Sequence, residues 1–159
     1  MFVLRRLKNE DVVIVKKWLE KEYVAKWFGD ESEWLYEIEH REDEFDFIKH
    51  FIVEEDGVPI GFCQYYDWKK AFKEDCEPAG TYGIDYMIGE EHLLGKGLGK
   101  KLVRLICDKL IEDQPDAIQL VADPTIEEER VNVASIKVLE TNGFRYDKET
   151  EIYKKLLIV

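Results

Sequence analysis

The segment whose residue types most directly suggest chemistry is a glycine-rich run at residues 94–101. Its residues are Leu94, Gly95, Lys96, Gly97, Leu98, Gly99, Lys100 and Lys101. The run follows a β-forming stretch at residues 81–88 and opens an amphipathic helical pattern, so backbone N–H groups at the start of that helix are free to bind an anion. Glycine lets an anion approach the backbone closely, and the helix dipole adds about half a positive charge at this end. The run therefore predicts a phosphate-binding site.

Two common phosphate-binding patterns do not fit this run. A P-loop has glycine at position 94 and serine or threonine at position 101, where this chain has Leu94 and Lys101. The dinucleotide fingerprint G-x-G-x-x-G fails in both registers, because Lys100 and Leu102 occupy its last position. Basic residues accompany the run and suit several phosphate groups on one ligand: Lys96, Lys100, Lys101 and Arg104. The alternative is a glycine-rich turn with solvated lysines.

An aspartate interrupts the β-forming stretch that precedes the glycine-rich run. Asp85 lies between Ile84 and Tyr86, where a mostly apolar strand is expected. A carboxylate among apolar residues costs free energy unless it is paired, and carboxylates with shifted pKa values are common in active sites. We interpret Asp85 as a catalytic or substrate-binding residue, with a structural hydrogen bond as the alternative.

Composition restricts the class of protein. The chain has 159 residues, of which 45% are hydrophobic and 36% charged, as is typical of one globular domain without a membrane span. Its formal net charge of −12 argues against nucleic-acid binding and favours a cationic partner, although acidity can also serve solubility alone. The cysteines and histidines lack metal-ligand spacing, so we predict no metal at Cys63, Cys76, Cys107, His40, His50 or His92. The N-terminal residues do not resemble a signal peptide, and we expect a cytoplasmic protein with no membrane partner.

The elements that would position these residues are both strands and helices. Strands are expected at residues 2–4, 45–53, 60–68, 81–88 and 117–122, with two more within 144–159. Helices are expected from residue 12, after a possible N-cap at Asn9, and at residues 22–28, 32–42, 98–110 and 129–141. A polar connector covers residues 69–80. Strands that gather early and late in the chain, with helices between them, predict one α+β domain over residues 1–159, a sheet covered by helices.

Two segments carry a resemblance to a known family. Gly97 and Gly99 match the signature Q/R-x-x-G-x-G/A, with Leu94 in place of the usual glutamine or arginine. A second segment matches N-x-x-S-I-x-x-L-E-x-x-G-F at Asn132, Ser135, Ile136, Leu139, Glu140, Gly143 and Phe144. Together they resemble the GNAT superfamily of N-acetyltransferases. The resemblance implies a mixed α/β, or α+β, GNAT fold: a mostly antiparallel central sheet of about six or seven strands, flanked by helices and splayed between the fourth and fifth strands.

The same resemblance implies acetyl-coenzyme A as the cosubstrate, with no metal. The residues that it assigns to this cosubstrate are Met87, Ile88, Leu94, Gly95, Lys96, Gly97, Leu98, Gly99, Lys100 and Asn132. In the family the pantetheine arm lies against the fourth strand like an added strand, so Met87 and Ile88 would supply backbone partners and help to polarise the thioester carbonyl. Many relatives carry a tyrosine, here replaced by Leu139, that protonates the departing thiolate. Either water supplies that proton in this chain or the thiolate leaves unprotonated.

Further segments in the N-terminal half, at residues 17–19, 27–29, 58–62 and 82–85, narrow the family. They look like the aminoglycoside 6'-N-acetyltransferases. The resemblance implies direct attack by an acceptor amine in a ternary complex, with Asp85 as base or ammonium-orienting group. It assigns the acceptor to Trp27, Tyr66, Asp85 and Asp123, and Trp27 could instead be a core aromatic. A polycationic acceptor also suits the aromatic and acidic residues Tyr65, Trp68, Glu74, Asp75 and Glu77, although the last three could form a solvated loop.

Other functions stay open on these residues. The segment S-I-x-V-L-E-x-x-G-F also resembles acetyltransferases of protein N-termini or ribosomal proteins, whose peptide acceptor needs an open groove. Polyamines are a further class of cationic acceptor. A coenzyme A-binding sensor module is the non-enzymatic alternative, favoured by the missing tyrosine and opposed by Asp85. We predict no nucleic-acid partner, and either a monomer or a homodimer.

Overall fold

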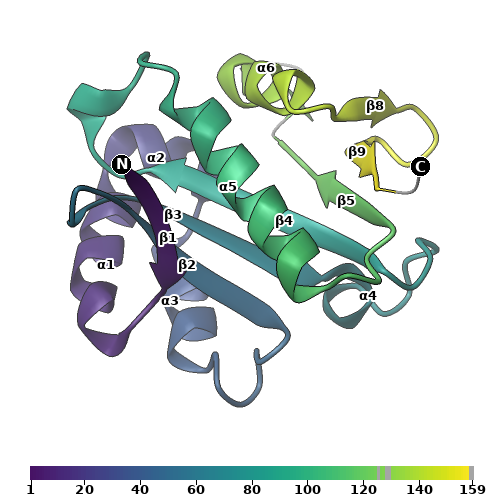
Figure 1. Cartoon of the computed structure of the whole chain (residues 1–159), viewed down its shortest axis with the longest axis horizontal. Coiled ribbons are helices and arrows are strands. Elements are labelled where there is room, and N and C mark those ends of the chain that lie inside the picture. Colours follow the sequence, from purple (N-terminus) through teal and green to yellow (C-terminus); the bar gives the residue numbers. More distant parts are fainter. Residues whose placement is uncertain (125, 128–129, 158–159) are drawn as a thin grey trace.

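The computed structural model describes residues 1–124, 126–127 and 130–157, and a seven-stranded sheet forms its centre (Figure 1). The order of strands is β1-β2-β3-β4-β5-β9-β8. Their bounds are Phe2–Arg6 (β1), Ile48–Glu55 (β2), Val58–Asp67 (β3), Thr81–Ile88 (β4), Gln119–Ala122 (β5), Arg145–Asp147 (β8) and Ile152–Leu156 (β9). β4 and β5 pair in parallel, and the other pairs of this sheet are antiparallel. The predicted α+β fold with a mostly antiparallel sheet is confirmed.

Helices cover both faces of this sheet. Their bounds are Val12–Glu20 (α1), Glu22–Phe28 (α2), Glu31–Glu39 (α3), Trp68–Ala71 (α4), Leu98–Asp113 (α5) and Val133–Thr141 (α6). In Figure 1, α1, α2 and α3 lie behind the sheet, whereas α5 crosses its front and contacts α6. Short 3-10 helices occupy Asn9–Asp11 and Glu91–Leu93, and a small separate sheet pairs β6 (Ile126–Glu127) with β7 (Arg130–Val131).

Alternation along the central strands builds two hydrophobic cores. In β2, Phe51 and Val53 belong to the core that contains Leu102 and Ile106 of α5. Ile52, between them, belongs to the core that contains Trp18 of α1. Successive side chains of a strand point to opposite faces of a sheet, so an apolar run buries both faces at once. The helices are therefore held on both sides by hydrophobic burial.

The sheet opens along the second half of β4. β5 pairs with β4 only at Thr81, Tyr82 and Gly83, whereas β3 pairs with β4 as far as Ile88. In the described part of the chain, residues 84–88 thus have a strand partner on one side only. The predicted splay between the fourth and fifth strands is confirmed, and it leaves backbone groups of β4 facing the opening.

Several predicted boundaries are wrong. β2 begins at Ile48 rather than at residue 45, because Phe45 and Phe47 pack against each other in a turn with ring centroids 5.9 Å apart. Trp68 begins α4 instead of ending β3. Asn9 begins a 3-10 turn, and Asp11 takes the N-cap position of α1.

The helix expected from residue 129 starts later, at Val133, which directly follows Asn132. The Asn132 carboxamide oxygen accepts a hydrogen bond from the Ser135 backbone N–H at 3.1 Å, which satisfies one donor of the first turn. Residues 130–131 form β7 instead, and residue 129, where the helix was expected to begin, lies outside the described residues.

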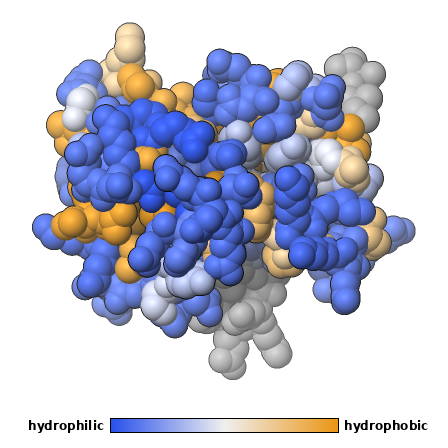
Figure 2. Space-filling model, turned by 90° about the horizontal axis from the view of Figure 1, so that it is seen from below, coloured by the Kyte–Doolittle hydropathy of each residue, from blue (hydrophilic) through white to orange (hydrophobic). Residues whose placement is uncertain are grey.

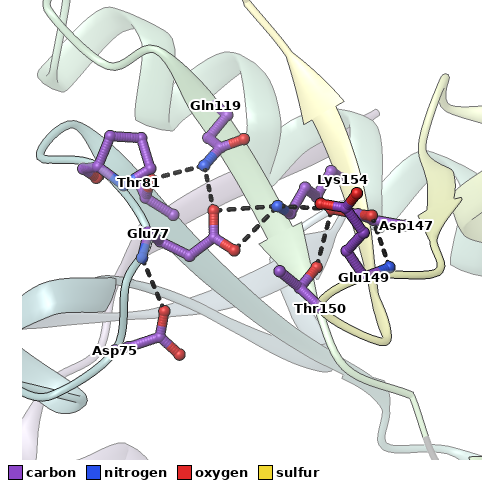
Figure 3. A network of polar contacts seen from close by, with 9 residues as sticks. Asp75, Glu77, Thr81, Gln119, Asp147, Glu149, Thr150 and Lys154 are labelled. Carbon is purple, nitrogen blue, oxygen red and sulfur yellow. Dashed lines mark hydrogen bonds and ion pairs between the residues drawn. The ribbon is translucent and has the colours of Figure 1, made fainter.

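A buried polar network holds the connector between β3 and β4 against the far side of the sheet (Figure 3). Glu77 is 4% exposed, and its carboxylate accepts a hydrogen bond from Gln119 Nε2 at 2.9 Å. Lys154 Nζ lies 2.9 Å from the same carboxylate and 2.8 Å from Asp147 Oδ2. The network joins Glu77 to β5, β9 and β8, so Glu77 is a structural residue, whereas Glu74 in the same connector is exposed.

The face of the molecule opposite the top of Figure 1, shown in Figure 2, is mostly polar. The face seen in Figure 2 carries mainly hydrophilic residues, with hydrophobic atoms gathered in smaller groups between them. Among the residues that the structure describes, no helix is long and apolar enough to cross a membrane.

Candidate active site

The glycine-rich run forms a loop that ends at the N-terminus of α5. Gly95 and Gly97 have φ angles of 76° and 78°, in the left-handed region that residues with a side chain rarely adopt. Gly97 is the N-cap residue of α5, and no side chain caps this helix. The first backbone N–H groups of α5 are therefore left for an anion.

A mostly apolar cavity of about 370 Å³ lies beside this loop, and we call it the loop cavity. It is lined by Tyr23, Val24, Trp27, Phe28, Tyr86, Met87, Ile88, Leu94, Gly95, Gly99, Asn132, Ala134, Ser135 and Val138. Residues 84–88 of β4, which lack a β5 partner, are called the unpaired half of β4. The cavity occupies the opening of the sheet, because its walls come from α2, from the unpaired half of β4 and from α6. Of the residues that the sequence assigns to the cosubstrate, it brings together Met87, Ile88, Leu94, Gly95, Gly99 and Asn132.

The remaining residues of that set do not line the loop cavity. Leu98 is 5% exposed and packs in the core beneath α5, so its side chain cannot contact a ligand in the cavity. Lys96, Gly97 and Lys100 are exposed on the loop and on the first turn of α5. Their position suits phosphate groups that lie outside the cavity, along the helix N-terminus.

A central cavity of about 100 Å³ adjoins the loop cavity. The two share Trp27, Phe28, Tyr86, Asn132 and Ser135 as walls. The central cavity adds Trp34, Ile84, Asp85, Ala122, Asp123, Pro124 and Leu139. These shared residues place the loop cavity next to the carboxylates of the central cavity.

An acidic cavity of about 350 Å³ lies on the other side of Asp85. It is lined by Phe28, Glu33, Trp34, Glu37, Phe45, Phe47, Ile48, Gln64, Tyr66, Ala71, Phe72 and Asp85. Phe28, Trp34 and Asp85 also line the central cavity, so the acidic cavity adjoins the central cavity at these residues. Asp85 is the carboxylate that central and acidic cavities have in common.

Asp85 is a carboxylate in an unfavourable electrostatic environment. Burial raises its pKa to about 6, and the negative charge of Asp123 adds to this shift. Gln64, its register partner on β3, donates a hydrogen bond from Nε2 to Asp85 Oδ2 at 2.9 Å, which acts in the opposite direction. Within the described residues, no lysine or arginine forms an ion pair with Asp85. A carboxylate held this way can accept a proton or bind a cation near neutral pH.

Glu37 is a second carboxylate of the acidic cavity, and the sequence reasoning missed it. Burial raises its pKa to about 7, with further contributions from the charges of Asp85 and Glu33. Glu37 lies on α3, whose sequence contains other glutamates of the same type, Glu31, Glu33 and Glu39. No local signal distinguishes the one glutamate that faces Asp85, because that depends on how α3 packs on the sheet.

Tyr66 lies close to these carboxylates. Burial raises the pKa of its hydroxyl well above the usual value, and Asp85, Asp123 and Glu37 contribute to the shift. A Cβ atom added at Gly83 would lie 2.4 Å from Cζ of Tyr66, so the ring packs directly over this glycine. The glycine two residues before Asp85 thus makes room for an aromatic wall of the acidic cavity.

Of the other residues that the sequence assigns to the acceptor, some line these cavities and some do not. Trp27 lines both the loop cavity and the central cavity, with Lys26 Nζ 4.8 Å from its ring centroid. Asp123 lines the central cavity at its exposed side, and partial burial raises its pKa. Tyr65 and Trp68 do not line these cavities: Tyr65 faces the α5 core and donates to Asp113 at 2.8 Å, and Trp68 is buried and stacks on Tyr66.

Comparisons with known proteins agree with this geometry. Residues 8–152 match the family model described as "Acetyltransferase (GNAT) domain". The chain belongs to the GNAT acetyltransferases. The aminoglycoside N(6')-acetyltransferase type 1 of Klebsiella pneumoniae is 28% identical over 158 residues, which cover 89% of this chain and 72% of that protein. The kanamycin resistance protein of Rhizobium radiobacter is 36% identical over 73 residues, 46% of this chain and 62% of that protein.

Solved structures confirm the fold. The crystal structure of aminoglycoside acetyltransferase AAC(6')-Ib in complex with coenzyme A and kanamycin has a TM-score of 0.81 and 23% sequence identity, and the match covers 99% of this chain and 95% of that one. The same enzyme in complex with coenzyme A alone has a TM-score of 0.80. The predicted GNAT fold and the predicted membership in the GNAT superfamily are both confirmed.

This GNAT acetyltransferase uses acetyl-coenzyme A as its cosubstrate, and the loop cavity fits that molecule. The mostly apolar walls and the unpaired half of β4 suit the pantetheine arm, while the uncapped N-terminus of α5 suits the pyrophosphate. Among the described residues, no group of histidine, cysteine and carboxylate side chains could hold a metal ion.

Proposed function

We propose that this acetyltransferase transfers the acetyl group to a primary amine of an aminoglycoside, the 6'-amine, by direct attack in a ternary complex. The observation that carries the proposal is the position of Asp85 between the central and acidic cavities. A polycationic acceptor in the acidic cavity would place an amine beside Asp85, while the thioester would reach the central cavity from the loop cavity. The Klebsiella pneumoniae relative and AAC(6')-Ib, both named above, are aminoglycoside acetyltransferases.

In the proposed reaction Asp85 takes the proton of the acceptor. An alkyl ammonium has a pKa near ~10 and is almost fully protonated at neutral pH, so it must lose a proton before its nitrogen can attack the carbonyl carbon. Asp85, with a pKa of about 6, is mostly ionised at neutral pH and accepts that proton. Backbone groups of Ile88, in the part of β4 that lacks a β5 partner, polarise the thioester carbonyl, whereas the Met87 carbonyl lies toward Gly61 of β3.

The acidic cavity supports a cationic acceptor with more than one amine. Glu37 and Asp85 both line it, and the pKa of each is raised because the buried negative charge has too little compensation. A bound ammonium supplies that compensation and lowers both pKa values. Aromatic walls such as Tyr66 and Phe28 suit the faces of sugar rings.

A thiol-release assay with acetyl-coenzyme A tests the proposal on kanamycin, tobramycin, spermidine and short N-terminal peptides. We expect turnover of the aminoglycosides with kcat/KM above ~10⁴ M⁻¹s⁻¹ and loss of that turnover in Asp85→Asn. Asp56→Asn is the matched control, because Asp56 lies in the exposed turn between β2 and β3.

Other outcomes identify a different acceptor. Turnover of peptides or spermidine alone would discard the antibiotic and keep the acetyltransferase. A protein that binds coenzyme A but acetylates none of these amines would instead favour the sensor module.

A further inference from the structure

Two hydroxyl groups meet at the junction of the loop cavity and the central cavity. Tyr86 projects from the unpaired half of β4, and Ser135 from the first turn of α6. The Tyr86 hydroxyl and Ser135 Oγ form a short hydrogen bond, and both residues line both cavities. A thioester in the loop cavity and an amine beside Asp85 would lie on the two sides of this junction.

Few groups at this junction can donate a proton. The residues shared by the two cavities are Trp27, Phe28, Tyr86, Asn132 and Ser135, and of these only Tyr86 and Ser135 carry a hydroxyl. Leu139, a hydrocarbon side chain with 0% exposure, closes the central cavity behind them. Tyr23 reaches the loop cavity alone, and its hydroxyl already donates to the Gly89 carbonyl at 2.7 Å.

Burial keeps the Tyr86 hydroxyl in its neutral form. Removal of water raises its pKa above the usual value, and the charge of Asp85 contributes in the same direction, whereas the hydrogen bond with Ser135 acts against the shift. At neutral pH the group therefore carries its proton and is available as a hydrogen-bond donor to an anion that forms in front of it.

We propose that Tyr86 gives its phenolic proton to the sulfur of coenzyme A as the thiolate leaves, and that Ser135 holds the hydroxyl in position. The proposal rests on the proposed function, amine acetylation in this site, and extends it to the second half of the reaction. Tyr86 thus supplies to the thiolate the proton that Leu139, a hydrocarbon side chain, cannot supply.

The acceptor nitrogen bonds to the carbonyl carbon while the carbon–sulfur bond breaks, and the electron pair of that bond stays on sulfur. The phenolic proton moves to sulfur and leaves a phenolate at Tyr86. Ser135 donates to this phenolate and water returns the proton to it, while Asp85 releases to water the proton that it took from the amine.

Tyr86→Phe tests the proposal, with Tyr82→Phe as matched control. Tyr82 lies on the same strand, but its hydroxyl donates to Gln114 and the residue lines none of the three cavities. We expect kcat to fall roughly 10²-fold in Tyr86→Phe with little change in KM for acetyl-coenzyme A, and no such fall in Tyr82→Phe. The rates are measured with whichever amine the wild type acetylates.

A second readout needs no acceptor and no turnover. The ultraviolet absorbance of the coenzyme A thiolate, followed as a function of pH in the complex, gives the pKa of the bound thiol. Because the Tyr86 hydroxyl stabilises the thiolate, this pKa should rise by about one unit in Tyr86→Phe and stay constant in Tyr82→Phe. Ser135→Ala should raise it in the same direction, and it serves as the test if circular dichroism shows that Tyr86→Phe does not fold.

The proposal requires both the fall in kcat and the rise in the thiol pKa in Tyr86→Phe. An unchanged thiol pKa would show that Tyr86 does not contact the sulfur, and an unchanged kcat would show that no proton passes through it; either result overturns the proposal. Failure of the proposed function is distinguishable, because a wrong acceptor leaves the thiol titration unaffected.

Discussion

Two groups of carboxylates lie in different parts of this fold, and they differ in the charges that surround them. On the far side, Glu77 and Asp147 share the ammonium group of Lys154, with nitrogen–oxygen distances of 2.9 and 2.8 Å. At the unpaired half of β4, Asp85 and Glu37 face one another's negative charge, with Gln64 as the hydrogen-bond partner of Asp85.

The difference appears directly in the pKa values. The bond with Lys154 lowers the pKa of Asp147 to about 2, whereas burial raises those of Asp85 and Glu37 to about 6 and about 7. The first group compensates its own charge and holds the connector, β5 and β9 together. Among the described residues, the negative charges of the second group lack a nearby cation, and a cationic ligand would supply one. The same two residue types, Asp and Glu, are thus charge-compensated in one place and, within the part of the chain that the structure describes, left without a cation in the other.

Replacement of the carboxylate at the centre of the second group should have the largest effect. In Asp85→Asn we expect kcat/KM for the acceptor to fall by roughly 10²–10⁴-fold, because the acceptor ammonium loses its proton acceptor. Coenzyme A affinity, measured by calorimetry, should not change. An active Asp85→Asn enzyme would contradict the assignment of Asp85 as the base.

Removal of a carboxylate from the first group should instead cost stability. Glu77→Gln leaves Lys154 buried without its full compensation, and we expect the free energy of unfolding to fall by about 3 kcal/mol. Urea unfolding measures this change, with Glu74→Gln in the exposed part of the connector as control. KM for acetyl-coenzyme A and for the acceptor should stay close to the wild-type values, and a selective rise in acceptor KM would place Glu77 in the site after all.

Loss of the second carboxylate in the acidic cavity should affect binding more than chemistry. In Glu37→Gln we expect KM for a polycationic acceptor to rise about tenfold, equivalent to about 1.4 kcal/mol, while kcat changes little. Glu39→Gln on the exposed side of α3 is the control. The effect should be smaller for an acceptor with a single amine, and an equal effect on both acceptors would remove Glu37 from the recognition of a second ammonium.

The smallest expected effect is on stability as a function of pH. The folded-state pKa of Asp85 lies above its unfolded value of 3.8, so the folded state binds more protons and this group lowers stability as pH rises from about 4 to about 6. Asp85→Asn should therefore melt at a higher temperature than the wild type at pH ~7.5 and at a similar temperature near pH ~4.

The contribution of Asp147 to stability changes with pH in the opposite direction, because the folded-state pKa of Asp147 lies below 3.8. Its contribution to stability is present above about pH 4 and is lost as pH falls toward about 2. Thermal melting of the wild type and of Asp85→Asn across the pH range separates the two groups. A melting difference between the two proteins that does not grow with pH would contradict the raised pKa of Asp85.

The sequence reveals the role of a carboxylate only where the signal comes from neighbouring residues, and not where the partner is distant along the chain. Asp85 is visible because a single charged residue interrupts an apolar β-run. Glu77 is misread because its partner Lys154 lies 77 residues further along the chain. Glu37 is invisible because the glutamates of α3 are alike in sequence and only the packing of the helix selects the one that faces Asp85.

The sequence by itself determines the local features of this protein: the strand that carries Asp85, the left-handed glycines before α5, and the apolar alternation that builds the two cores. These follow from backbone preferences and from spacing within a few residues. Only the tertiary structure decides that β5 leaves β4 after Gly83, that Tyr86 meets Ser135 at the opening, and that Glu37 rather than Glu77 joins Asp85. Those contacts join residues distant in sequence, and their geometry is set by how whole elements pack against the sheet.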